Sequence, residues 1–126
     1  MDKKKTDFIK DIKEFMKKAN RLIKVDKFIL FGSRANKTAK KGSDIDLLVI
    51  SKDFEGVKSF KRSPSLYLLW DAPYDIDIIC LTPYELSLKM KEVGVIRQAM
   101  KEGIELWLDL RKKNQIWLLS IFRRVD

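Results

Sequence analysis

Two pairs of aspartates stand out because each pair lies beside a run of apolar residues. Asp44 and Asp46 precede the run Leu47 to Ile50, and Asp75 and Asp77 lie beside a similar run. Side chains two positions apart on a β-strand share one face of the sheet, so each pair is expected to project together. Neighbouring carboxylates raise each other's pKa, and a divalent cation such as Mg²⁺ removes the conflict. Alternatively, the pairs are polar strand ends that face water.

A glycine and a serine follow the apolar run KFILF at 27–31. Gly32 would allow the backbone to approach a phosphate closely, and Ser33 offers a hydroxyl donor. If the next residues open a helix, its free N–H groups would favour an anion. Arg34 and the lysines after it add positive charge. The Gly-Lys-Ser/Thr ending of a Walker loop is missing, and a Gly-Ser pair alone more often marks a turn.

The elements that must position these residues are strands with helices between them. Apolar periodicity predicts a helix over 7–18 and strands over 27–31, 43–50 and 74–81. The strand at 43–50 is apolar on both faces beyond its aspartates, which is typical of a central strand covered on both sides.

The remaining segments predict further helices around the sheet. Residues 54–70 have a helical pattern that Pro64 must break or kink. The sequence TPYE predicts the start of a helix with a capping box. A second short helix is predicted to end at Gly103. The segment IELWL at 104–108 is expected to be an edge strand. Together these predict an α/β or α+β domain, with a small mixed β-sheet and flanking helices.

Composition narrows the class of protein. A chain of 126 residues fits one domain, and its net charge of +9 favours polyanionic partners, although it also promotes solubility. The chain has no histidine and one cysteine, Cys80, which excludes Ser-His and Cys-His catalysis and an internal disulfide. No apolar stretch resembles a signal peptide or approaches the ~20 residues of a membrane span, so a cytoplasmic location is expected.

The motifs combine into a recognisable pattern. Gly32-Ser33, ten intervening residues and Asp44-Ile45-Asp46 in an apolar strand resemble the nucleotidyltransferase motif of the DNA polymerase beta superfamily. GSRA at 32–35 and SDIDL at 43–47 resemble in particular the minimal nucleotidyltransferase (MNT) family. The likeness continues through DIDII and AMKEGIELW and spans about Val25 to Leu108. Asn36-Lys37, where many relatives have glycine, and Pro64 depart from the pattern.

The resemblance implies a minimal polymerase beta-like nucleotidyltransferase domain over residues 1–108. It implies two Mg²⁺ ions, with Mn²⁺ as an alternative, that are held by Asp44, Asp46 and a third aspartate. Asp77 is aligned with that third position, and Asp75 remains its rival. A hydroxyl would attack the α-phosphorus of ATP and expel pyrophosphate. The residues implied to bind the nucleotide are Gly32, Ser33, Arg34 and Ser43.

The resemblance also implies a partner. Stand-alone members commonly pair with HEPN proteins, which are helical toxin ribonucleases, so the chain is expected to be an antitoxin that transfers AMP from ATP to a hydroxyl on its toxin. The tail 109–126 has no clear family counterpart and is expected to be a partner-binding helix or a partly disordered end. A non-catalytic antitoxin that masks its partner, and nucleotide addition to RNA, remain as alternatives. The nucleobase, the acceptor and the oligomeric state stay open.

Overall fold

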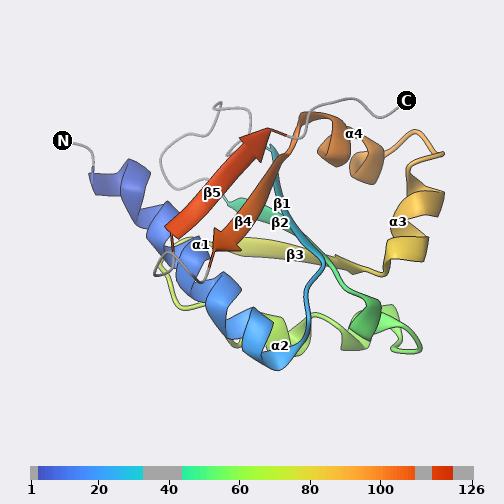
Figure 1. Ribbon diagram of the computed structural model, residues 1–126, viewed down its shortest axis with the longest axis horizontal. Helices are drawn as coiled ribbons and strands as arrows, with labels where there is room; N and C mark the ends of the chain where they lie inside the picture. The colour runs from blue at the N-terminus through green and yellow to red at the C-terminus, as the bar shows by residue number, and fades with distance from the viewer. Residues whose placement is uncertain (1–2, 33–43, 110–114, 121–126) are drawn as a thin grey trace.

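The computed structural model describes residues 3–32, 44–109 and 115–120 (Figure 1). This part of the chain contains four α-helices and five strands, and two three-residue 3-10 turns lie between β2 and α2. The main elements in order are α1 (Lys3–Leu22), β1 (Lys27–Phe31), β2 (Ile45–Ile50), α2 (Pro64–Tyr67), β3 (Ile76–Leu81), α3 (Pro83–Lys89), α4 (Val95–Glu102), β4 (Ile104–Asp109) and β5 (Gln115–Ser120).

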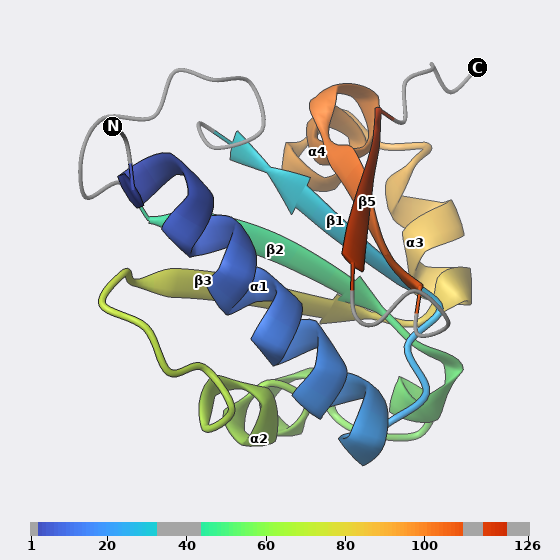
Figure 2. The ribbon, with the colours of Figure 1, turned by 60° about the vertical axis from the view of Figure 1, so that its left-hand side comes forward.

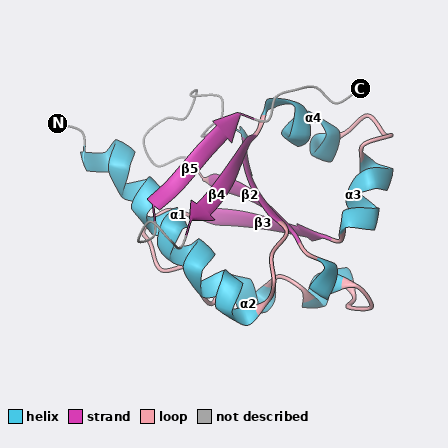
Figure 3. Ribbon diagram, in the orientation of Figure 1, coloured by secondary structure: helices cyan, strands magenta, loops and turns pink. Residues whose placement is uncertain are grey.

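The five strands form one mixed sheet in the order β3-β2-β1-β4-β5. Figure 3 draws the strands in magenta and the helices in cyan. β2 and β3 run parallel, whereas β1 is antiparallel to both β2 and β4, and β4 is antiparallel to β5. A parallel pair requires a crossover connection, and here residues 51–75 supply it through the two 3-10 turns and α2. The predicted α+β class with a small mixed sheet is confirmed.

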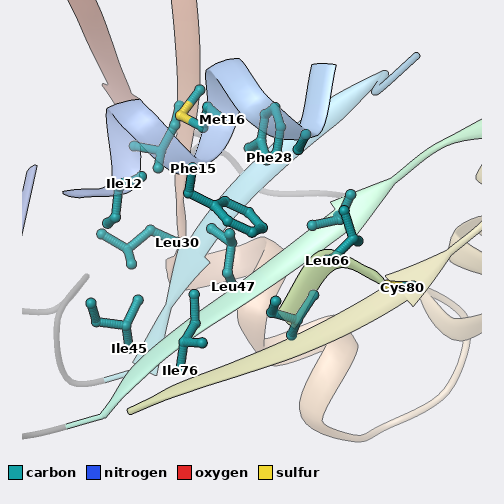
Figure 4. Packing of buried hydrophobic residues seen from close by; sticks show 14 of the residues in the cluster. Ile12, Phe15, Met16, Phe28, Leu30, Ile45, Leu47, Leu66, Ile76 and Cys80 are labelled. Carbon is teal, nitrogen blue, oxygen red and sulfur yellow. The ribbon is translucent and has the colours of Figure 1, made fainter. Parts of the chain in front are cut away.

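Helices cover both faces of this sheet. α1 and α2 lie over one face, and α3 and α4 lie over the other (Figure 2). Ile12, Phe15 and Met16 recur on the inner side of α1 and are at most 1% exposed, as the apolar stripe of an amphipathic helix requires. The ring of Phe15 lies edge-on to those of Phe28 and Trp70, with centroids 6.5 and 5.9 Å away. Figure 4 shows Phe15 reaching down from α1 onto the sheet.

β2 is the central strand that its sequence predicted. Leu47 and Val49 pack in the cluster beneath α1, and Leu48 and Ile50 pack in the cluster beneath α4. Both faces are therefore buried for the length of the strand, except where the aspartates stand.

Among the described residues, no helix is long and apolar enough to cross a membrane.

The segment 54–70 does not form the predicted helix. It contains the end of a 3-10 turn at Lys52–Phe54, a second turn at Ser59–Lys61 and the short α2, whose first residue is Pro64. Gly56 has a φ of +78°, which ends the first turn, and proline is tolerated at the start of a helix but not in its interior. The predicted capping box is confirmed at α3, where Thr82 and Glu85 bond each other's backbone N–H.

The end of the chain also differs from the expectation. IELWL is not an edge strand, because β4 lies between β1 and β5. Within the tail, residues 115–120 form strand β5, which pairs with β4 over six positions, with Trp107 opposite Trp117. A helix is therefore wrong for this stretch, where the hydrogen bonds of the ladder satisfy the backbone instead. β5 carries the sheet beyond residue 108, the predicted boundary of the domain.

Candidate functional site

Asp46 and Asp77 lie directly opposite each other on neighbouring strands. The parallel register of β2 and β3 pairs Ile45 with Ile76 and Asp46 with Asp77. Residues in register share a face of the sheet, and this is the face that α3 and α4 cover further along the strands. Asp46 is half-buried and Asp77 is exposed. The fold therefore brings together two carboxylates that are 31 positions apart in the sequence.

Asp44 and Asp75 occupy equivalent places just before their strands. Both are exposed. The carbonyl oxygen of Asp75 accepts the backbone N–H of Ile45 at 2.8 Å, which extends the ladder by one position. Of the two candidates for the third carboxylate, the structure sets Asp77 opposite Asp46. The role of Asp44, Asp46 and Asp77 as metal ligands remains a prediction.

The pKa of Asp46 responds to this crowding. Partial burial raises it above its ordinary value, and the negative charges of Asp77 and then Asp44 raise it further. The ionised carboxylate is thus disfavoured where it stands, and a cation beside it would favour the ionised form by offsetting the neighbouring negative charges. Within residues 3–32, 44–109 and 115–120, no three His, Cys, Asp or Glu side chains converge closely enough to hold a metal ion.

Gly32 packs against Asp46 at the end of β1 and is part of the same site. It follows β1, where Phe31 is in register with Asp46. Its φ is +74°, a conformation that favours glycine. A Cβ atom at this position would overlap Oδ2 of Asp46 and lie 3.2 Å from its Cγ. Glycine is therefore required at this position for two reasons: the backbone turn needs a positive φ, and the carboxylate of Asp46 leaves no space for a side chain. Ser33, Arg34 and Ser43 lie outside the described residues, so their nucleotide-binding role stays a prediction.

A groove of about 500 Å³ opens beside Gly32. Phe31 and Gly32 form one side, and the loop before α4 together with α4 itself forms the other. This part of α4 was not predicted to belong to the site. The feature of the sequence that could have indicated a role for α4 is a pair of polar residues, Gln98 and Glu102, which lie four positions apart on a helix.

Comparison with known families matches residues 9–124 to the model of the nucleotidyltransferase domain. The chain belongs to the nucleotidyltransferase domain family. The match covers most of the sequence, so the resemblance to the minimal nucleotidyltransferases is confirmed. It also extends past residue 108 and takes in β5.

A solved structure shows the same fold. The nucleotidyltransferase resembles a Sulfolobus solfataricus protein solved at 1.40 Å resolution, whose own assignment as a nucleotidyltransferase is an inference. The TM-score is 0.64, the identity is 22%, and the match covers 87% of this chain and 86% of the other. At this identity the likeness shows the fold. A comparison with curated proteins finds no match.

Proposed function

We propose that this nucleotidyltransferase transfers AMP from ATP to a hydroxyl on a partner protein. The observation that carries the transfer chemistry is the pairing of Asp46 with Asp77 at the turn made by Gly32, in a chain whose family transfers nucleotides. The choice of partner rests on the sequence alone. GSRA and SDIDL resemble the stand-alone members that pair with HEPN toxins, so the chain would act as the antitoxin.

The chemistry of the carboxylates supports a divalent cation as their ligand. They are hard oxygen donors, which Mg²⁺ and Mn²⁺ prefer. The pKa of Asp46 is raised first by burial and then by the negative charges of Asp77 and Asp44, and a cation would offset those charges. Asp46 and Asp77 would hold the metal from the two strands, and Asp44 would join them from the residue before β2. When bound, the ions would activate the attacking hydroxyl and balance the charge of the triphosphate.

The chain itself would hold the two reactants in position. Gly32 lets the carboxylate of Asp46 pack against the turn after β1, since a side chain at this position would overlap Oδ2 of Asp46. The acceptor oxygen would form a bond to the α-phosphorus while the bond from that phosphorus to the pyrophosphate oxygen breaks. The hydroxyl proton passes to solvent, and the products are an adenylylated hydroxyl and pyrophosphate. Holding both reactants in line on a rigid sheet accounts for much of the acceleration in such a reaction.

The test is a transfer assay with α-labelled ATP, Mg²⁺, the purified chain, the HEPN protein encoded nearest to it and total cellular RNA. We expect label on the HEPN protein with the wild type, and loss of label with Asp46→Asn and with Asp77→Asn. Asp75→Asn is the matched control, because Asp75 lies two residues before Asp77, directly ahead of β3, and not opposite Asp46. It should retain transfer. Equal losses in Asp75→Asn and Asp77→Asn would contradict the site.

Two other outcomes identify the alternatives. Labelled RNA, with the HEPN protein unlabelled, would establish RNA as the acceptor, which the net charge of +9 favours. A stable complex that neutralises the toxin, without transfer to protein or RNA, would establish a masking antitoxin. Either outcome would overturn transfer to the partner.

A further inference from the structure

The groove beside Gly32 is continuous with the carboxylate site. Gly32 lines the groove and is also the residue that packs against the carboxylate of Asp46. The opposite wall is held close to the sheet: a Cβ on Gly103, directly after α4, would lie 2.8 Å from Cγ2 of Ile29 and 2.9 Å from the carbonyl oxygen of Leu30. A nucleotide with its phosphates at Asp46 would therefore meet this groove within its own length.

The groove has the size and walls of a nucleobase site. Its volume of about 500 Å³ is within the roughly 300–1,000 Å³ typical of small-molecule sites. Phe31, Val93, Val95 and Ala99 give it apolar walls. Val93 and Val95 are 93% and 64% exposed, although valine gains by leaving water. A planar base between these walls would cover the exposed apolar surface.

Two polar side chains line the same groove. Gln98 and Glu102 both face it from α4, and Nε2 of Gln98 donates a hydrogen bond to Oε2 of Glu102. This bond places the amide and the carboxylate side by side on the exposed surface of α4. A carboxylate only accepts hydrogen bonds, whereas an amide both donates and accepts. The pair therefore suits a base edge that offers an amino donor next to a ring acceptor.

We propose that this groove binds the nucleobase and that Glu102 accepts a hydrogen bond from the 6-amino group of adenine. Gln98 would donate to the adjacent ring nitrogen. The inference rests on the proposed nucleotidyl transfer and adds the residues that select the base. Hypoxanthine and uracil present a carbonyl oxygen where adenine presents its amino group, and an oxygen facing a carboxylate is left unpaired. The protein should thus discriminate against both.

The test compares the binding of ATP and inosine triphosphate with Mg²⁺, measured by calorimetry. The two nucleotides differ at position 6 of the purine, which is amino in one and oxo in the other. Because a hydrogen bond to a charged group is at stake, the wild type should bind ATP about tenfold to a hundredfold more tightly. Glu102→Ala should reduce this ratio to near one. Glu92→Ala, which removes an exposed glutamate that does not line the groove, should leave the ratio unchanged.

A second pair of variants tests the groove itself. Gly94 lines the groove in an extended conformation, and a Cβ there meets no atom within 4 Å. Gly94→Leu should fold and block the groove, so that binding of every nucleotide weakens at least about tenfold, whereas the smaller Gly94→Ala should bind nearly as the wild type does.

The outcomes separate this inference from the proposed function. Equal affinity of the wild type for ATP and inosine triphosphate, or unchanged binding in Gly94→Leu, would overturn the base site while leaving nucleotidyl transfer intact. If the wild type bound no nucleoside triphosphate at all, both would fail. If Gly94→Leu bound nucleotides normally but lost the partner protein, the groove would be a protein-docking surface and the inference would be wrong.

Discussion

At the scale of single residues, Asp46 is a position where function and stability oppose each other. Its pKa is higher in the folded chain than its ordinary value of 3.8, first because of burial and then because of Asp77 and Asp44. Ionisation of Asp46 therefore destabilises the fold. The penalty is absent at acid pH, where the carboxyl is protonated in both states, and appears as pH rises through the folded-state pKa.

This sign gives the first prediction. Without metal, Asp46→Asn should be more stable than the wild type at pH 7, and the difference should vanish below about pH 4. Urea unfolding of both proteins across this range measures it. Asp75→Asn controls for the change in net charge, since it lies outside the opposed pair. A variant less stable than the wild type at neutral pH would contradict the argument.

Gly32 gives the second prediction, because its two constraints can be separated. Gly32→Ala combines a positive φ with overlap between the new Cβ and the carboxylate of Asp46. Gly56→Ala has a similar φ of +78° but meets nothing within 4 Å. Strain in this region is worth about 1–2 kcal/mol, and both variants should lose that much stability on urea unfolding.

Only Gly32→Ala should also lose nucleotidyl transfer, because the carboxylate must move. A misplacement of about 1 Å near reacting groups is enough to reduce the rate about 100-fold. The α-labelled ATP assay distinguishes the two variants. Equal activity in both would mean that the carboxylate accommodates a methyl group without moving.

At the scale of elements, the crossover is tied to the sheet by Arg62. Its guanidinium donates to both carboxylate oxygens of Glu85, at 2.5 and 3.0 Å, and to the carbonyl oxygens of Val57 and Cys80. The hydrogen bonds from Arg62 are the main reason that the pKa of Glu85 falls to about 2. The same carboxylate accepts the N–H of Thr82, so one ion pair joins the crossover to the start of α3.

The third prediction concerns acid stability. A lowered pKa means that Glu85 stabilises the fold above its ordinary pKa of 4.5, and that this contribution is lost as pH falls through about 2. Glu85→Gln should reduce the free energy of unfolding by about 1 kcal/mol at pH 7, since solvent screens the exposed part of the carboxylate. The two proteins should converge near pH 2 in urea unfolding followed by circular dichroism.

The control is the exposed pair between Lys89 and Glu92, whose charged atoms are 3.8 Å apart. Glu92→Gln should change stability by less than about 0.5 kcal/mol at any pH. If Glu85→Gln behaved in the same way, the ion pair of Arg62 would contribute nothing to holding the crossover.

The elements also show what a sequence can predict. The strands and the capping box follow from local patterns, so KFILF and TPYE predicted β1 and the start of α3. The crossover could not be predicted in this way, because Arg62 and Tyr67 bond residues of β3 that are 18 and 11 positions away. These contacts override a helical pattern that Pro64 already weakens.

The candidate site, like the fold, could be predicted from the sequence only in part. Its aspartates were evident as Asp-x-Asp pairs, but the choice between Asp75 and Asp77 depends on the register of two parallel strands. The groove was missed because it arises where α4 packs across β1, through Ala99 and Ile29. Such a contact has no signature in either segment alone.

At the scale of the whole molecule, β5 completes the sheet. A chain ending at Asp109 would lose the partner of β4 along six positions. Each backbone hydrogen bond contributes about 0.5–1.5 kcal/mol net, so the fourth prediction is a loss of roughly 3 kcal/mol or more on removal of residues 110–126. Urea unfolding measures this. Unchanged stability together with lost partner binding would show instead that the tail is a separate recognition arm.

The hydroxyl of Tyr67 has an effect beyond its own neighbourhood. It accepts the backbone N–H of Ile78 at 2.9 Å, on the outer side of β3, which is the last strand of the described sheet at that end. An open strand of this kind offers a template on which a second molecule can add a strand of its own and begin an aggregate. Tyr67 occupies a donor in the middle of that template, so a foreign strand could not pair along its full length. The irregular crossover thus protects concentrated protein from edge-to-edge association.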